Sequence, residues 1–362
     1  MNDTQTNSTS GRSLVGRCFV HPLFDYLAIG GGLSLITTAL VLWLSPPGQA
    51  TSMTMLPWII LLSNSSHFAA STVRLYTKPG TRETLPFVTM ALPLLTIMLL
   101  TLCMYWAGTV GGTIQMLYLM WSPYHYAAQA YGLGVMYSYR SGCNLSPADK
   151  SLYWWIALLP FFYANIDGGL RHLLPQFTPE VLFSDQPQVA AAVRQATSML
   201  GIAAIVLPLL LYLKVWRGRS GPMPLISLLT VITNGLWFVV FDYYQAFVWA
   251  TVFHGIQYLA IVTIFHAREQ CALPGNTHRP AWHVARFYVL SLLLAYGLFN
   301  CWPQAYMFAG FGPAESVLMV VAVINIHHFI IDAYIWRLHK GDSNRKVVDA
   351  AVAAPEIAQA AI

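Results

Sequence analysis

The sequence contains very little charge. Only 9% of its 362 residues are charged and 56% are hydrophobic, and the mean hydropathy is +0.54. A soluble domain carries about 25% charged residues, so this composition cannot supply a water-exposed surface. We therefore expect an all-α, polytopic protein of the lipid bilayer. The net charge of +5 needs no nucleic-acid partner, because basic residues collect in the loops of such proteins.

The sequence also lacks paired cysteines and the motifs of soluble enzymes. Its five cysteines show no CxxC spacing, which argues against a disulfide framework and against a structural zinc site. No GxSxG, HExxH or phosphate-loop motif is present. The run "IGGGLS" at 29–34 lies inside an apolar stretch, where glycines indicate close helix packing. Any chemistry must therefore come from polar side chains inside the apolar stretches.

Apolar stretches long enough to cross a bilayer recur ten times, since about 20 helical residues span the roughly 30 Å of hydrocarbon. We place them at about 25–44, 55–76, 85–106, 113–137, 150–166, 190–213, 223–243, 246–267, 283–302 and 314–336. Lys and Arg follow the even-numbered stretches and precede the first, so the positive-inside rule predicts that both termini are cytoplasmic. We expect a cytoplasmic tail at 1–18, a transmembrane helical domain at 19–340 and a cytoplasmic C-terminal tail at 341–362.

Several of these stretches contain histidine. An ionisable group inside a bilayer costs several kcal/mol, roughly, unless it pairs or binds something. One such histidine could simply make an interhelical hydrogen bond, but this many on separate helices favour one shared metal site. The candidate ligands are His21, His67, His125, His254, His327 and His328.

Two carboxylates share the helix spacing of these histidines. His21 and Asp25 are four residues apart, as are His328 and Asp332, so each pair lies on one helix face. A carboxylate there can orient an imidazole toward a metal or bind the metal itself. His327 and His328 are about 100° apart around the helix, so we expect one of them to face the site and the other to face a neighbouring helix.

Other polar side chains accompany the histidines. Tyr124, Gln129 and Tyr258 lie within one turn of a histidine and could orient ligands or contact substrate. Imidazole and carboxylate without thiolate suit non-haem Fe(II), with zinc or copper as alternatives. A haem held between two histidines is a further alternative, with Gly132, Gly134 and Gly255 leaving room for the macrocycle.

The histidine motifs resemble a known family. The stretches "HPLFD" at 21–25, "SSHF" at 65–68, "VFHGIQY" at 252–258 and "HHFIIDAYIWR" at 327–337 are similar to motifs of the bacteriorhodopsin-related-protein (Brp/Blh) family of membrane beta-carotene 15,15'-dioxygenases. The resemblance implies histidine-bound non-haem iron that cleaves carotene to retinal. It implies metal ligands at His21, His67, His254 and one of His327 and His328.

The sequence departs from that family's pattern in its length, with extra helices, in the stretch around His125 and at Tyr258. Tyr258 stands one turn after His254, where the family pattern has a second histidine, and His125 could supply the missing ligand. We expect an integral protein of a bacterial inner membrane, an oxygenase-like oxidoreductase that uses dioxygen on a carotenoid, an isoprenoid or an acyl chain. The alternatives are a haem- or quinone-linked electron-transfer protein and a histidine-lined proton or metal transporter. The sequence does not set the oligomeric state.

Overall fold

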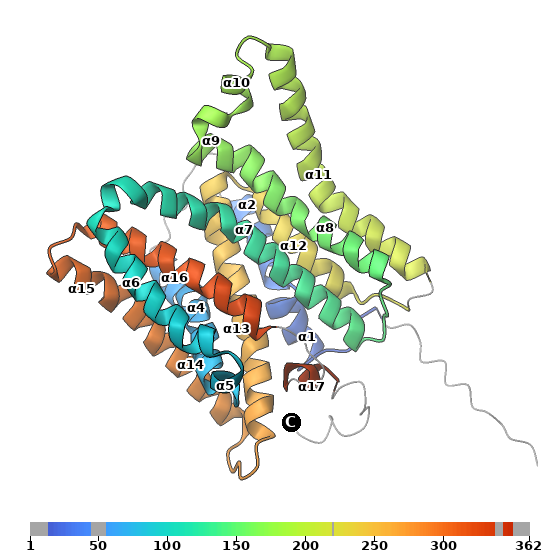
Figure 1. Cartoon of the computed structure of the whole chain (residues 1–362). Helices are drawn as coiled ribbons and strands as arrows, with labels where there is room; N and C mark the ends of the chain where they lie inside the picture. Colours follow the sequence, from blue (N-terminus) through green and yellow to red (C-terminus); the bar gives the residue numbers. More distant parts are fainter. Residues whose placement is uncertain (1–13, 45–55, 219–220, 337–342, 350–362) are drawn as a thin grey trace, which may run out of the picture.

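The computed structural model describes residues 14–44, 56–218, 221–336 and 343–349 (Figure 1). These residues form helices joined by short connections, with no strand among them, which confirms the all-α prediction. The predicted tails at 1–18 and 341–362 lie largely outside the described residues, as do the loop at 45–55 and the basic residues Arg12, Arg337 and Lys340.

Each predicted apolar stretch coincides with one helix or with a few consecutive helical segments. The first six stretches correspond to α1 (Pro22–Phe24), η1 (Asp25–Ile29) and α2 (Gly32–Leu44); α3 (Leu56–Ile60), η2 (Leu61–Ser65) and α4 (Ser66–Thr77); η3 (Phe87–Ala91) and α6 (Leu92–Tyr105); α7 (Ala107–Arg140); α8 (Pro147–Ala164); and α11 (Pro187–Arg217). The last four correspond to α12 (Leu225–Val240); α13 (Tyr243–Cys271); α14 (Pro280–Tyr296), η6 (Gly297–Cys301) and α15 (Trp302–Phe308); and α16 (Pro313–Ile335). Short elements complete the described chain: α5 (Thr81–Thr84), η4 (Asn165–Gly169), α9 (Leu170–Leu173), η5 (Pro175–Phe177), α10 (Pro179–Leu182) and α17 (Ser343–Asp349).

Five of these helices are long and apolar enough to cross a membrane. They are Phe87–Tyr105, α11, α13, Pro280–Phe308 and α16. The first stretch adds a sixth if the segments Pro22–Ile29 and Gly32–Leu44, which meet at 57°, form one bent span. The chain therefore has the helices that a membrane protein requires, and the count of ten spans stays a prediction.

Helix α13 lies at the centre of the bundle (Figure 1). Two thirds (67%) of its most apolar segment is buried, compared with 22% for α11 and 17% for Pro280–Phe308. It packs against α4, α12 and α14, while α16 packs against α4, α6 and α7. The outer helices expose many Leu, Ile and Val side chains, as helices that face lipid do. Polar residues on α13 and α16 are thereby kept inside the protein.

Two residues that interrupt the apolar pattern have different effects on the helices. Pro160 lies inside α8, which continues past it to Ala164. Asp242 begins α13, because its side chain accepts a hydrogen bond from the backbone N–H of Gln245 at 3.0 Å. Such an N-cap satisfies an otherwise unpaired backbone donor.

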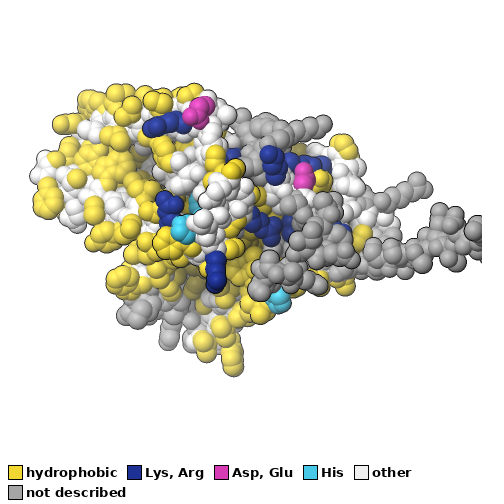
Figure 2. Space-filling model, turned by 90° about the horizontal axis from the view of Figure 1, so that it is seen from below, with side chains coloured by type: hydrophobic (Ala, Val, Ile, Leu, Met, Phe, Trp, Pro, Cys, Tyr) yellow, Lys and Arg dark blue, Asp and Glu magenta, His cyan; other side chains and the backbone are white. Residues whose placement is uncertain are grey.

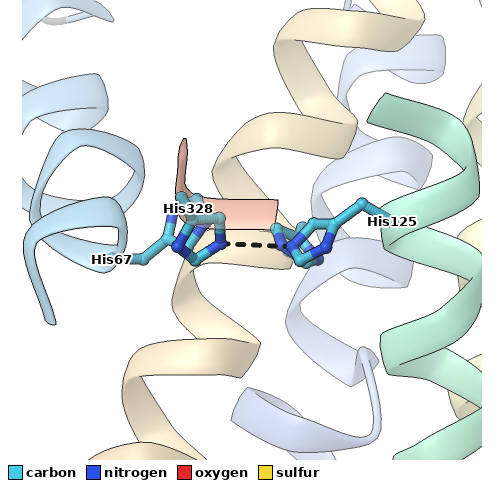
Figure 3. Close-up of side chains that lie close together, drawn as sticks. His67, His125 and His328 are labelled. Atoms are coloured by element: carbon cyan, nitrogen blue, oxygen red, sulfur yellow. Dashed lines mark hydrogen bonds between the residues drawn. The ribbon is translucent and has the colours of Figure 1, made fainter. Parts of the chain in front are cut away.

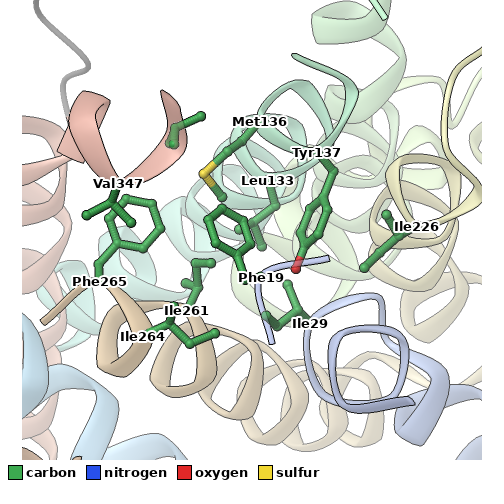
Figure 4. Packing of buried hydrophobic residues seen from close by; sticks show 11 residues of the cluster. Phe19, Ile29, Leu133, Met136, Tyr137, Ile226, Ile261, Ile264, Phe265 and Val347 are labelled. Carbon is green, nitrogen blue, oxygen red and sulfur yellow. The ribbon is translucent and has the colours of Figure 1, made fainter. Parts of the chain in front are cut away.

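The short helix α17 packs against the body of the protein, where the sequence predicts only a tail. Val347 and Val348 are buried in a cluster with Phe19, Leu133 and Phe265 (Figure 4). The side-chain amide of Asn344 donates to the Ile335 carbonyl at 2.7 Å. This segment is too short and polar for its docking to show as an apolar stretch in the sequence.

Basic side chains gather at the end of the bundle where α17 docks. Buried Arg74 forms an ion pair with Glu269 (3.0 Å) and donates to Asn344. Arg140 donates to the Cys18 carbonyl at 2.9 Å. Figure 2 shows this end, on which Lys and Arg side chains outnumber Asp and Glu.

Candidate metal centre

Four histidines from four helices meet inside the bundle. His67 comes from α4, His125 from α7, His254 from α13 and His328 from α16, and all four are buried. One ring nitrogen from each lies within 4.8 Å of those of the other three. Figure 3 shows His67, His125 and His328 pointing toward one another. These residues lie up to 261 positions apart in the sequence, so the bundle is what brings them together.

A glycine lets two of these helices approach closely. Gly255 follows His254 on α13, and a Cβ atom there would lie 2.8 Å from the Ser63 carbonyl oxygen of η2. No larger residue fits such a distance without moving one backbone away from the other. The contact places the His254 ring beside the His67 ring, with centroids 5.0 Å apart.

The hydrogen bonds of two histidines fix which ring nitrogen carries the proton. Nδ1 of His67 lies 2.7 Å from the Asn64 carbonyl oxygen, which can only accept. The Ser71 hydroxyl donates to the Phe68 carbonyl at 2.8 Å, so it accepts from Nδ1 of His328, also at 2.8 Å. Both rings are therefore Nδ1–H tautomers in their neutral form. Nε2 of each keeps a lone pair that can bind a metal.

Two of the Nε2 atoms have no hydrogen-bonding partner among the described residues, and two others lie close together. Those of His67 and His254 are buried without a hydrogen-bond partner, a state that usually costs about 1–3 kcal/mol per group. Nε2 of His125 and Nε2 of His328 lie 3.2 Å apart. Nitrogens bound to one tetrahedral metal at 2.0–2.1 Å are separated by about 3.4 Å. A hydrogen bond could satisfy the His125–His328 pair alone, whereas a metal ion could bind all four nitrogens if those up to 4.8 Å apart moved closer together.

Asp332 adds a carboxylate to the cluster. Its Oδ2 lies 3.3 Å from Nε2 of His328 and 3.8 Å from Nε2 of His125. Its Oδ1 accepts a hydrogen bond from the Tyr258 hydroxyl at 2.8 Å. The predicted i, i+4 pairing of His328 with Asp332 is thus present. Tyr258, which stands where the family pattern has a histidine, holds the carboxylate in place.

The structure does not bring His21 and Asp25 to this cluster. His21 is exposed, and its Nδ1 accepts a hydrogen bond from the backbone N–H of Leu23 at 3.2 Å. Asp25 accepts from the Val20 N–H at 3.1 Å and from the Tyr137 hydroxyl at 2.8 Å. The shared spacing reflects a capped helix start here: the His21 ring caps α1, and Asp25 accepts from the backbone that precedes α1.

His327 faces away from the four histidines. Its Nδ1 lies 2.7 Å from the Thr96 hydroxyl of α6. Because the Thr96 hydroxyl donates to the Leu92 carbonyl at 2.8 Å, it accepts from His327. The doublet thus divides as the helix geometry predicts, with His328 in the cluster and His327 against a neighbouring helix.

An apolar cavity of about 410 Å³ adjoins the cluster. His125, Asp332 and Tyr258 lie at its polar side, and Tyr124 and Gln129 line it as well. Gln129 donates to the side-chain oxygen of Gln257 at 2.8 Å. Apart from Gly132, the apolar lining was not predicted from the sequence; it consists of Trp121, Ala128, Leu133, Met136, Ile261, Phe265, Phe329, Ala333 and Trp336. Their spacing resembles that of ordinary core residues, so no local signal marks them.

The ligand atoms suit a metal ion bound by imidazole better than a thiolate-bound metal or a haem. The cluster of four histidines contains no cysteine. Burial raises the pKa of the Cys18 thiol to about 11, so this cysteine is not a thiolate at neutral pH. Gly134 faces the Tyr153 side chain and Gly255 faces the Ser63 backbone, so neither leaves room for a macrocycle; of the three predicted glycines only Gly132, which lines the 410 Å³ cavity, has open space beside it. The four rings converge from four helices, so a macrocycle between any two of them would overlap the other two.

A scan against protein-family models, a search of curated proteins and a search of solved structures found no match. The resemblance to the Brp/Blh family therefore remains a hypothesis. Of its implied ligands, His67, His254 and His328 lie in the cluster, whereas His21 lies outside it.

Proposed function

We propose that this protein is an integral membrane oxidoreductase, oxygenase-like, that uses a histidine-bound metal to oxidise a lipid-soluble substrate with dioxygen. The observation that carries the proposal is the convergence of four buried histidines beside an apolar cavity. Buried lone pairs without partners are costly, and buried polar groups that converge on an apolar pocket are typical of an active site.

Non-haem Fe(II) is the metal that suits this site best, with zinc or copper as alternatives. Imidazole and carboxylate ligands without thiolate favour iron among the redox-active metals. A bound iron ion supplies the electron transfer by which dioxygen becomes reactive toward an apolar molecule. His67, His125, His254 and His328 would hold the ion.

The surrounding side chains have distinct roles in this proposal. The Asn64 carbonyl and the Ser71 hydroxyl hold the Nδ1–H sides of His67 and His328, so that Nε2 points inward. Asp332 stands within reach of the same ion or of a proton released during the reaction. Tyr258 fixes the Asp332 carboxylate. Truncating such supporting residues typically lowers metal affinity about 10–100-fold.

The cavity supports a substrate with an extended apolar part. At about 30 Å³ per water-sized group, its 410 Å³ accommodates about 14 non-hydrogen atoms. An isoprenoid or acyl segment fits this space, and a carotenoid would place only one part of its chain there. Tyr124 is 38% exposed on the bundle surface and also lines the cavity, so substrate can reach the site from the surrounding lipid.

The positions of basic residues support the proposed ten spans with both termini cytoplasmic. Arg74 lies at the end of the second stretch, and Arg140 and Arg268 follow the fourth and the eighth. All three contact the segment before α1 or α17. Basic residues near helix ends favour the cytoplasmic side. We place this end of the bundle in the cytoplasm of a bacterial cell, with the protein in the inner membrane.

Elemental analysis with an optical spectrum of the purified protein tests the proposal. Nitric oxide, a probe that replaces dioxygen, is then added to the anaerobic protein, and electron paramagnetic resonance detects its binding to Fe(II). We expect iron, no haem Soret band and a nitric oxide signal. A Soret band would support the electron-transfer alternative, and a protein that takes up no metal would exclude the enzyme.

A further inference from the structure

A second cavity borders the four-histidine cluster at His328. It measures about 150 Å³, and both His328 and the neighbouring Phe68 line it. It lies among α4, α6, α16 and the segment Pro280–Phe308; the rest of its lining is Thr72, Leu75, Tyr76, Pro93, Thr96, Ile97, Leu294, Leu298, Trp302, Ile324, His327 and Ile331. The 410 Å³ cavity meets the cluster at His125 and Asp332 instead.

The polar groups on this wall are largely occupied within the protein. The His327 ring is bound to Thr96, and the Tyr76 hydroxyl donates to the Thr89 carbonyl at 2.5 Å. Nδ1 of His328 is bound to Ser71. The remaining wall is mainly aliphatic and aromatic, so the cavity favours an apolar occupant.

The size of the cavity limits that occupant to a very small molecule. At about 30 Å³ per water-sized group, 150 Å³ corresponds to about five such groups. An apolar cavity of about this volume stays dry and binds xenon or benzene. Ile97 is 50% exposed on the outer surface, so the wall of the cavity borders the lipid, in which apolar gases dissolve.

We propose that the 150 Å³ cavity is a binding site for dioxygen, through which it reaches the metal while the larger cavity holds substrate. This inference rests on the proposed oxidoreductase function. An oxygenase needs both reactants at the metal together, and a bulky substrate in the 410 Å³ cavity would block the His125 side. The cavity beside His328 leaves a second approach.

Xenon, which binds where small apolar gases bind, provides a probe that needs no metal. Crystals of the full chain are pressurised with xenon, and stopped-flow spectroscopy measures how fast dioxygen oxidises the iron-loaded, reduced protein. The variants Ile97→Trp and Thr72→Leu narrow the cavity from two helices. Ile36→Trp, at a residue that is also 50% exposed but lies on α2, is the matched control.

We expect xenon beside Phe68 and His328 in the wild-type protein and in the control. We also expect that narrowing the cavity removes xenon and slows oxidation several-fold, with metal content unchanged. Absence of xenon from the wild-type cavity would overturn the inference, as would unchanged oxidation rates in both narrowed variants. A protein that binds xenon here but holds only zinc would refute the oxidoreductase, whereas xenon binding would still establish a gas site.

Discussion

Replacing Gly255 with alanine should loosen the metal site without removing any ligand. The added Cβ would lie 2.8 Å from the Ser63 carbonyl oxygen, 3.0 Å from the Ser63 carbonyl carbon and 3.1 Å from Asn64 Cα. All three are backbone atoms, which cannot turn aside as a side chain can. Since ordinary contacts begin at 3.4 Å, α13 and η2 must separate by about 0.6 Å.

The separation acts directly on two ligands. His254 precedes Gly255, and Asn64 holds the His67 ring. Metal–ligand distances tolerate deviations of only about 0.2 Å, so a 0.6 Å shift exceeds what the site can absorb. We expect metal affinity to fall about 10–100-fold, as when an orienting partner is lost. Overpacking should also lower the free energy of unfolding by about 1–3 kcal/mol.

Competition with a chelator measures the affinity, and thermal unfolding in detergent measures the stability. Gly112→Ala on α7 is the control, because a Cβ there meets nothing within 4 Å. It should keep full metal affinity and unfold at the same temperature or slightly above, since alanine favours helix over glycine. If Gly255→Ala bound metal as tightly as Gly112→Ala, the close approach would not position the ligands.

Three further substitutions test other parts of the structure. Tyr258→Phe removes the hydroxyl that donates to Asp332 and should weaken metal binding about tenfold with little change in far-UV circular dichroism; unchanged affinity would argue against its role. Arg74→Met leaves Glu269 buried without a counter-charge and should lower the free energy of unfolding by about 3–5 kcal/mol. A loss below about 1 kcal/mol would show that the Arg74–Glu269 ion pair is not buried as described. Hydrogen bonds from Lys214 and Ser146 lower the pKa of Asp149, so the stabilisation by the Asp149 carboxylate is complete above the ordinary carboxyl pKa and is lost as the pH falls through the lowered pKa. Asp149→Asn should therefore reduce the fall in melting temperature at acid pH. The same fall in the variant as in the wild-type protein would exclude a contribution from Asp149.

The sequence predicts the helices well because their signal is local. Each apolar stretch is long enough to appear without tertiary information, and each coincides with helical segments. The short helix α17 escapes prediction, since Val347 and Val348 become a buried pair only against Phe19 and Phe265. The local pattern therefore predicts helices with long apolar stretches and misses a short helix that is buried only by contacts with distant parts of the chain.

The candidate site is predictable in part for the same reason. His67, His125 and His254 are conspicuous because an ionisable side chain is costly inside an apolar helix. His21 has the same sequence spacing to a carboxylate as His328, yet it lies at a helix start, where its ring accepts from the backbone of Leu23. Spacing along one helix cannot distinguish a cap from a ligand. Only the packing of several helices does.

The metal content of matched histidine variants tests the central claim most directly. The 362-residue chain is purified, reconstituted anaerobically with Fe(II) and analysed beside His67→Ala, His254→Ala, His21→Ala and His327→Ala, with monodispersity checked for each. We predict that the wild-type protein, His21→Ala and His327→Ala retain iron and that His67→Ala and His254→Ala lose it. A wild-type protein that binds no metal, or folded His67→Ala and His254→Ala proteins with wild-type iron, would contradict the account.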